Sequence, residues 1–116
     1  MGKPVIYHNP RCSKSRETLA LLESRGVAPE VVRYLDTPPD SATLRALLKK
    51  LGIGPRDLMR TKEPEYRELG LDDESLSEAA LVSALVAHPK LIERPVFVNG
   101  ERAVIGRPPE KVLEIL

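Results

Sequence analysis

The sequence is short of thiols and of aromatic rings. Its 116 residues include one cysteine, so no disulfide can form within the chain, and a redox cycle would need a thiol from another molecule. Tryptophan is absent and aromatic residues make up 3%, which leaves few rings to stack on the bases of single-stranded nucleic acid. We therefore expect no internal redox pair and no nucleic-acid partner.

An excess of one charge and long hydrophobic runs are also missing. The 18 basic and 17 acidic residues give a formal net charge of +1, so any anion site must be a local feature. No apolar run approaches the roughly 20 residues of a membrane-spanning helix, and no secretory hydrophobic segment opens the sequence. No cluster of cysteine and histidine predicts a metal site. These absences predict a cytoplasmic protein with no membrane partner and no bound metal.

The first third of the chain predicts two parallel strands joined by a helix. Short β-branched runs favour strands over Lys3–Tyr7 and Glu30–Leu35. Between them, Ser13–Arg25 has helical spacing. The apolar face of this helix would carry Leu19, Ala20 and Leu22. Strands connected in this way pair in parallel in the same sheet.

The rest of the chain predicts a helical insertion over about 40–90, followed by a hairpin and a last helix. Helix signals in the insertion are the leucines after Asp40, the prolines that open two turns, and the capping-box pattern Ser75–Glu78. Asn99-Gly100 between two apolar runs is a strong hairpin signal. The last helix would turn Val112, Leu113 and Leu116 to one side. This order predicts an α/β, thioredoxin-like fold with a mixed central sheet in a single domain, residues 1–116.

Cys12 lies between the first strand and the first helix. Unpaired main-chain N–H groups and the positive end of the helix dipole favour a thiolate at such a position, and the thiolate is the nucleophilic form. Four basic side chains within four positions act in the same direction: His8, Arg11, Lys14 and Arg16. A lone cysteine is more often a buried structural residue, but these charged neighbours argue against an apolar environment. We therefore interpret Cys12 as a nucleophile.

The positions after Cys12 restrict the mechanism. A phosphatase-type loop would need arginine at position 18, which is Thr18, and a Cys-x-x-Cys pair would need cysteine at position 15, which is Ser15. Cys12 would then attack an external electrophile, and an external thiol would regenerate it.

Two Arg-Pro pairs, Arg94-Pro95 and Arg107-Pro108, bracket the predicted hairpin. A guanidinium group binds tetrahedral oxyanions through two parallel hydrogen bonds, so we predict an oxyanion site there, to which Arg60 is a weaker addition. Pro95 begins a strand, where thioredoxin folds place a cis proline beside the catalytic cysteine. Without the fold, a trans bond is the more frequent outcome.

The segment I-Y-H-N-P-R-C-S-K-S-R-E-T-L at Ile6–Leu19 resembles the opening motif of the glutaredoxin-dependent arsenate reductases, within the thioredoxin-like superfamily. The resemblance continues through four further segments: Tyr34–Pro39, Leu58–Arg60, Glu93–Val96 and Gly106–Leu113. The chain is similar to a short branch of that family. It departs from better-known members at Arg11, Ser13 and Lys14, where those members carry small or neutral residues.

The resemblance implies an enzyme that reduces arsenate, or a similar oxyanion, to arsenite. Cys12 would form a thiol-arsenate adduct, glutathione would join as co-substrate, and glutaredoxin would resolve the mixed species, with no bound cofactor. Arg60, Arg94 and Arg107 would bind the oxyanion. His8 would help to ionise the thiol, and Ser15 would donate a hydrogen bond near the thiolate.

Two other functions stay open. The first is a regulator resembling the Spx family, which shares this fold and binds RNA polymerase. Spx proteins usually carry a Cys-x-x-Cys switch and lack the Gly-Arg-Pro found at Gly106–Pro108, so both features favour an enzyme. The second is a general glutathione-dependent oxidoreductase acting on mixed disulfides of proteins. Three arginines would be superfluous there, although arginine can also bind the carboxylates of glutathione.

Overall fold

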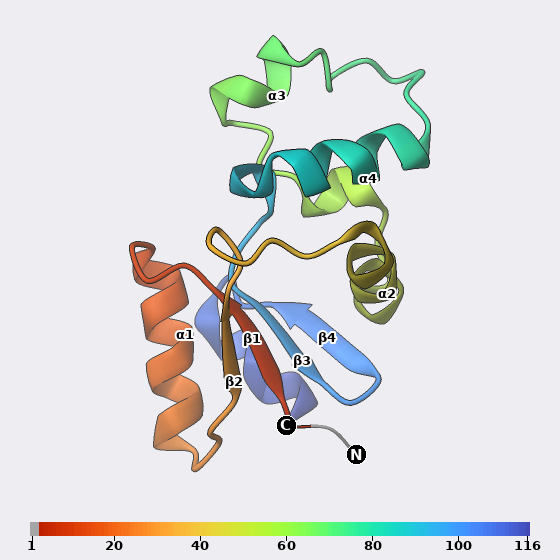
Figure 1. Cartoon of the computed structure of the whole chain (residues 1–116). Coiled ribbons are helices and arrows are strands. Elements are labelled where there is room, and N and C mark those ends of the chain that lie inside the picture. The colour runs from red at the N-terminus through yellow and green to blue at the C-terminus, as the bar shows by residue number, and fades with distance from the viewer. Residues whose placement is uncertain (1–2) are drawn as a thin grey trace. The chain divides into compact units, whose positions relative to one another are not determined.

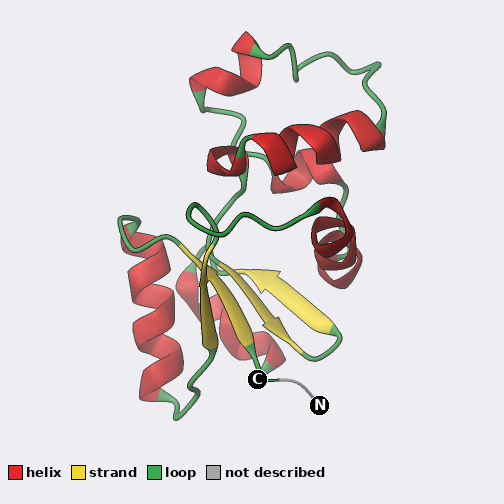
Figure 2. Cartoon of the chain, in the orientation of Figure 1, coloured by secondary structure: helices red, strands yellow, loops and turns green. Residues whose placement is uncertain are grey.

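A computed structural model describes residues 3–116, which contain a mixed β-sheet and several helices (Figures 1 and 2). The chain divides into two compact units. The first unit consists of the residues up to Thr37 together with Arg94–Leu116, and the second unit is Pro38–Glu93. The helical insertion expected at about 40–90 lies within the second unit.

The first unit contains the sheet. Its elements are β1 (Val5–His8), α1 (Ser13–Ser24), β2 (Glu30–Arg33), β3 (Val96–Asn99), β4 (Arg102–Ile105) and the 3-10 helix η3 (Pro109–Ile115). The strand order is β2-β1-β3-β4. β1 pairs in parallel with β2 and antiparallel with β3, and β3 pairs antiparallel with β4. The α/β class and the mixed sheet are therefore confirmed.

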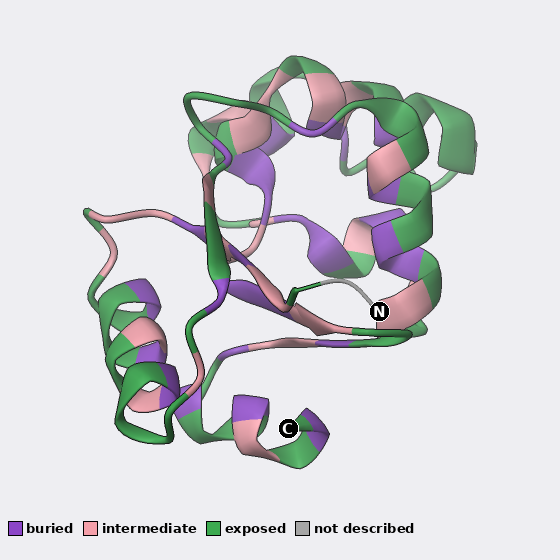
Figure 3. Ribbon diagram, turned by 60° about the horizontal axis from the view of Figure 1, so that its bottom comes forward, coloured by how far each residue is buried: buried purple, intermediate pink, exposed green. Residues whose placement is uncertain are grey.

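The main hydrophobic cluster of the first unit is aliphatic apart from Phe97, and Tyr34 is also buried in this unit. Ile6 of β1 pairs with Phe97 of β3, and α1 and η3 pack against them. The fully or nearly buried members of this cluster, which belong to the purple residues of Figure 3, are Ile6, Leu22, Phe97, Val112 and Ile115. This packing holds α1, whose N-cap residue is Cys12, against the sheet.

The buried face of α1 differs from the predicted one. Ser15, Thr18 and Leu22 are buried, whereas Ala20 is exposed. Hydrophobicity alone missed this face because two of its members are polar and bury their hydroxyl groups in hydrogen bonds. The Thr18 hydroxyl, for example, donates to the carbonyl oxygen of Lys14 at 2.8 Å.

The last element also differs, because it is a 3-10 helix. With three residues per turn, positions i and i+3 share a face. Pro109, Val112 and Ile115 are accordingly buried, and Leu116, which the sequence placed on the inner side, is 46% exposed.

Several predicted boundaries shift by one or two residues. β1 extends to His8, and β2 ends at Arg33 because the Arg33 carbonyl oxygen accepts hydrogen bonds from the N–H groups of Asp36 and Thr37. The hairpin is confirmed, but Asn99 pairs with Arg102, so its two-residue loop is Gly100-Glu101. Gly100 takes the positive φ of 65° that this loop needs.

The second unit is helical. It contains α2 (Ser41–Leu51), η1 (Pro55–Leu58), α3 (Pro64–Glu68), α4 (Glu78–Ala87) and η2 (Pro89–Leu91). Asp40 caps α2, and Gly52 ends it in the left-handed conformation. α4 is capped by Ser77, whose hydroxyl accepts from the N–H of Ala80 at 3.1 Å, rather than by Ser75 of the predicted capping box. No helix within residues 3–116 is long and apolar enough to cross a membrane.

Within the second unit, the segments on either side of residues 61–90 lie side by side. Met59 and Ile92 form an isolated antiparallel bridge. The N–H of Arg60 donates to the carbonyl oxygen of Leu91, and the N–H of Glu93 donates to that of Leu58, both at 2.7 Å. The main chain at Arg60 is therefore fixed by hydrogen bonds within this unit.

Candidate active site

Cys12 is the N-cap residue of α1, with an extended main chain (φ −93°, ψ 123°). Its N–H donates to the carbonyl oxygen of Asn9 at 3.0 Å, and its carbonyl oxygen accepts from the N–H of Arg16 at 3.0 Å. The residue is partly exposed, and the first turn of α1 has no acidic side chain. The only thiol of the chain thus lies at a helix N-terminus, where main-chain N–H groups lack helical partners.

His8 and Ser15 bond to each other beside this loop. Nδ1 of His8 lies 2.6 Å from Oγ of Ser15, and the N–H of Asn9 donates to the same oxygen at 3.0 Å. Ser15 is fully buried and His8 is 6% exposed. These contacts connect the end of β1 to the first turn of α1 and hold the loop that carries Cys12 at both ends.

The environment of His8 favours its neutral form. Burial lowers the pKa of His8 below its ordinary value, and the positive charges of Arg33 and Arg16 lower it further. In the neutral form Nδ1 can accept the hydroxyl proton of Ser15. His8 therefore orients Ser15 and adds no positive charge near the thiol. From the sequence, His8 was expected to be one of four basic side chains that favour the thiolate.

Two of the other basic neighbours have local partners. Nη1 of Arg16 donates to the carbonyl oxygen of Pro10 at 2.9 Å, which stabilises the loop, and Nζ of Lys14 lies 3.5 Å from a carboxylate oxygen of Glu17. The Arg11 side chain is exposed, while its N–H donates to Oδ1 of Asn9 at 3.0 Å.

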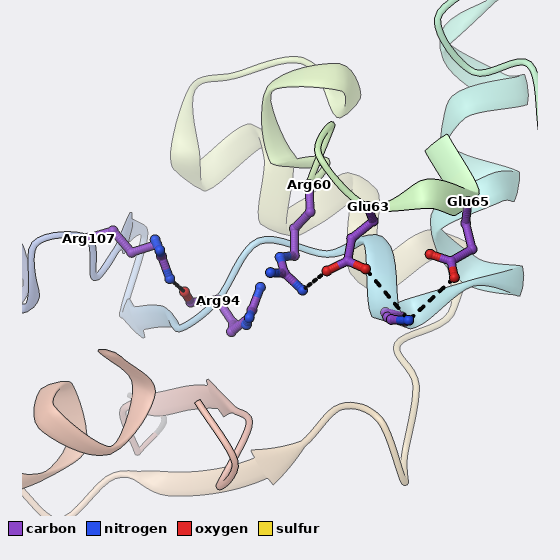
Figure 4. Close-up of polar contacts among 6 residues, drawn as sticks. Arg60, Glu63, Glu65, Arg94 and Arg107 are labelled. Atoms are coloured by element: carbon purple, nitrogen blue, oxygen red, sulfur yellow. Dashed lines mark hydrogen bonds and ion pairs between the residues drawn. The ribbon is translucent and has the colours of Figure 1, made fainter. Parts of the chain in front are cut away.

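The two Arg-Pro pairs meet at one end of the β3–β4 hairpin. Val96 pairs with Ile105, and the N–H of Gly106 donates to the carbonyl oxygen of Pro95 at 2.9 Å. Nη1 of Arg107 lies 3.4 Å from the carbonyl oxygen of Arg94 (Figure 4). The Arg94–Pro95 peptide bond is cis, and so is Arg107–Pro108, for which the sequence analysis made no such prediction.

This hairpin end packs against α1. The hydroxyl oxygen of Thr18, which donates its proton to Lys14, also lies 3.3 Å from the carbonyl oxygen of Gly106. A Cβ atom on Gly106 would lie 2.9 Å from that hydroxyl oxygen and 3.0 Å from Cγ of Pro95, so the contact requires glycine. Because Tyr7 pairs with Val96, continuing the register places Pro95 beside His8. Thr18 and Gly106 could not be identified from the sequence, because their roles depend on contacts between distant segments.

Arg60 belongs to the second unit and has its own ionic partners. Nη1 of Arg60 lies 2.5 Å from Oε1 of Glu63, and their side chains are 27% and 16% exposed (Figure 4). Nζ of Lys90 lies 3.6 Å from the other oxygen of Glu63 and 3.3 Å from Oε1 of Glu65. Glu63 therefore orients the guanidinium group of Arg60. The shared role of Arg60 with Arg94 and Arg107 stays a prediction.

The first unit alone assembles a recognisable set of groups. The N-terminus of α1, which carries the Cys12 thiol, and the guanidinium groups at the adjacent end of the sheet supply N–H donors suited to a tetrahedral oxyanion. Within residues 3–116, no group of three or more histidine, cysteine, aspartate or glutamate side chains could hold a metal ion.

Comparison with known proteins gives consistent matches. The ArsC family matches residues 7–115. An uncharacterized protein of Escherichia coli K12, YfgD, is 65% identical over 100% of this chain and 99% of its own length, and an arsenate reductase of Haemophilus influenzae is 54% identical over 97% of each. The solved structure of an arsenate reductase from Vibrio cholerae has a TM-score of 0.96 at 56% identity and covers 98% of both chains. The chain belongs to the ArsC family.

Proposed function

We propose that this protein reduces arsenate to arsenite in the cytoplasm, with Cys12 as the nucleophile, glutathione as the second thiol and glutaredoxin as the protein that regenerates it. The observation that carries the proposal is the single thiol of an ArsC-family chain at the open N-terminus of α1. Relatives that match over nearly the whole chain are named arsenate reductases, which supports the choice of substrate.

The chemistry follows from having one cysteine. The Cys12 thiolate attacks arsenic, a sulfur–arsenic bond forms, and one oxygen leaves as water after protonation. The thiolate of glutathione then attacks the Cys12 sulfur, and the electron pair of the sulfur–arsenic bond passes to arsenic, which falls from As(V) to As(III). Arsenite leaves, and Cys12 remains in a mixed disulfide with glutathione. A glutaredoxin thiolate takes up the glutathione and releases Cys12.

The other site residues would bind the charged oxyanion and hold the Cys12 loop in position. Arg94 and Arg107, with Arg60, would bind the oxyanion through paired hydrogen bonds. Ser15, hydrogen-bonded to His8, would keep the Cys12 loop in place. The Ser15 hydroxyl group would lie in the first turn of α1. Arsenate and phosphate share shape and charge, so only the reducible sulfur–arsenic adduct separates the two. Phosphate would be a weak competitive inhibitor.

The test is arsenate-dependent oxidation of NADPH in the presence of glutathione, glutaredoxin and glutathione reductase. We expect turnover with the wild-type protein and none with Cys12→Ser, while circular dichroism shows that the variant is folded. Reduction by Cys12→Ser would place the chemistry elsewhere.

Two parallel assays address the alternatives. A glutathionylated peptide replaces arsenate in the same coupled system. If the peptide is reduced and arsenate is not, the protein is a general glutathione-dependent oxidoreductase. Co-purification with RNA polymerase, combined with no turnover of either substrate, would favour the Spx-like regulator.

A further inference from the structure

A cleft of about 190 Å³ opens at the carboxyl ends of β1 and β2 in the first unit. Its lining residues come from the last residues of β1 and β2, the Cys12 loop and the turn after β2: His8, Asn9, Pro10, Arg11, Arg33, Leu35 and Asp36. His8 pairs with Arg33 in the parallel β1–β2 ladder, which brings the two segments together. The cleft therefore shares a wall with the loop that leads into Cys12.

The cleft lies on the opposite side of β1 from the Arg-Pro pairs. In the sheet order β2-β1-β3-β4, the cleft is at the β2 side, and Arg94 and Arg107 flank β3 and β4. Cys12 follows the interior strand β1, so its loop has one group of charged residues on each side. The reaction also needs two ligands at the same sulfur, an oxyanion and a second thiol.

The charges of the cleft are mixed. Arg11 and Arg33 contribute two guanidinium groups, Asp36 contributes one carboxylate, and His8 is neutral because its pKa is lowered. Nε of Arg33 lies 3.7 Å from Oδ2 of Asp36, with side chains 61% and 70% exposed. An ion pair that is so exposed and so long is weak, which leaves both groups free to bind a ligand. A small oxyanion would meet an unfavourable carboxylate here.

We propose that this cleft binds the reducing thiol as a small peptide that carries two carboxylates and one ammonium group, the charge pattern of glutathione. Arg11 and Arg33 bind the carboxylates and Asp36 binds the ammonium group. The cleft is smaller than the roughly 300 Å³ of pockets that enclose a drug-sized ligand. It therefore holds the charged ends of the peptide while the thiol reaches across the loop to Cys12. This inference rests on the proposed function for its second thiol.

Binding of the peptide thiol in this cleft can be measured without arsenate. Cys12 thiolate attacks one sulfur of oxidised glutathione, a Cys12–glutathione disulfide forms, the original disulfide breaks, and one glutathione thiolate leaves. Intact-protein mass spectrometry follows the rate. The uncharged bis(2-hydroxyethyl) disulfide undergoes the same exchange and serves as the reference. The ratio of the two rates cancels any change in the reactivity of Cys12 itself.

We expect the wild-type rate to saturate with oxidised glutathione and to stay linear with the neutral disulfide. Arg33→Ala and Arg11→Ala should lower the ratio of the two rates by roughly two- to fivefold each, the size of an exposed charge pair. Arg33→Lys should recover part of the loss. Arg25→Ala, at the exposed far end of α1, is the matched control and should leave the ratio unchanged.

Asp36→Asn tests the third contact. It should slow exchange with oxidised glutathione and leave exchange with its N-acetylated form unaffected, because acetylation removes the ammonium group. An unchanged ratio in both arginine variants, or an equal loss with both disulfides, would overturn the proposal. Wild-type protein that saturates with oxidised glutathione but does not reduce arsenate would instead contradict the proposed function and leave the docking site standing.

Discussion

The two units of the chain bury different kinds of side chain. The buried polar side chains of residues 3–116 are His8, Ser15 and Thr18, and all three lie in the first unit near Cys12. The buried side chains of the helical unit are mainly leucines, and its ionic groups, including Arg60 and Glu63, are partly exposed. Burial of a polar group is unfavourable unless it is hydrogen-bonded, so such groups persist where they have a task. The difference indicates that the first unit orders the reactive loop, while the helical unit depends on packing.

The largest loss of stability should come from truncating a buried leucine in the helical unit. Leu85 is fully buried in α4, so Leu85→Ala should lower the free energy of unfolding by roughly 2–5 kcal/mol, through lost burial and the cavity left behind. Urea denaturation measures it. Ser83→Ala, an exposed position on the same helix, should change stability by less than about 0.5 kcal/mol. Similar losses in the two variants would contradict a unit held by its leucine core.

Arg107→Lys should act on substrate binding and not on stability. Lysine keeps the charge but loses the planar fork, which should cost roughly 1–3 kcal/mol of oxyanion binding and raise KM for arsenate by about 5- to 150-fold. Steady-state kinetics and urea denaturation together make the test. A KM equal to that of the parent would exclude bidentate binding by Arg107.

Ser15→Ala should modestly lower both the stability of the fold and the rate of turnover. It leaves Nδ1 of His8 and the N–H of Asn9 without their partner, which should destabilise the fold by about 1–2 kcal/mol and slow turnover by loosening the Cys12 loop. Ser13→Ala, an exposed position in the same turn, serves as the control. If Ser15→Ala lost stability with full activity, the polar cluster would be structural only.

The smallest effect concerns pH. The pKa of His8 is lowered in the fold from its ordinary value of 6.5, so the unfolded chain binds the proton more readily. The contribution of His8 to stability is complete above about pH 6.5 and is lost as the pH falls through the lowered folded-state value. Urea denaturation of wild type and His8→Asn at several pH values should show a steeper acid loss for the wild type. Parallel curves would mean that His8 is not held neutral.

Local signals in the sequence predicted the elements well, and contacts between distant segments account for what was missed. Asn99-Gly100 predicted the hairpin and Asp40 the start of α2, since each acts through its immediate neighbours. Helical spacing could not indicate that α1 buries Ser15 and Thr18, because their partners are in β1 and after β4. Cys12 was placed correctly at the helix N-terminus because strand, loop and helix are consecutive in the chain.

The bridge between Met59 and Ile92 has a consequence for how this protein can vary. Residues 61–90 leave and return through two adjacent segments joined by main-chain hydrogen bonds, so they form a loop whose ends are already closed. Lengthening such a loop costs little, because closure entropy grows only with the logarithm of its length. Insertions or deletions between α3 and α4 would therefore leave the main chain of Arg60 where the bridge holds it. Homologues and engineered variants can differ in this helical segment and still keep that arginine in place.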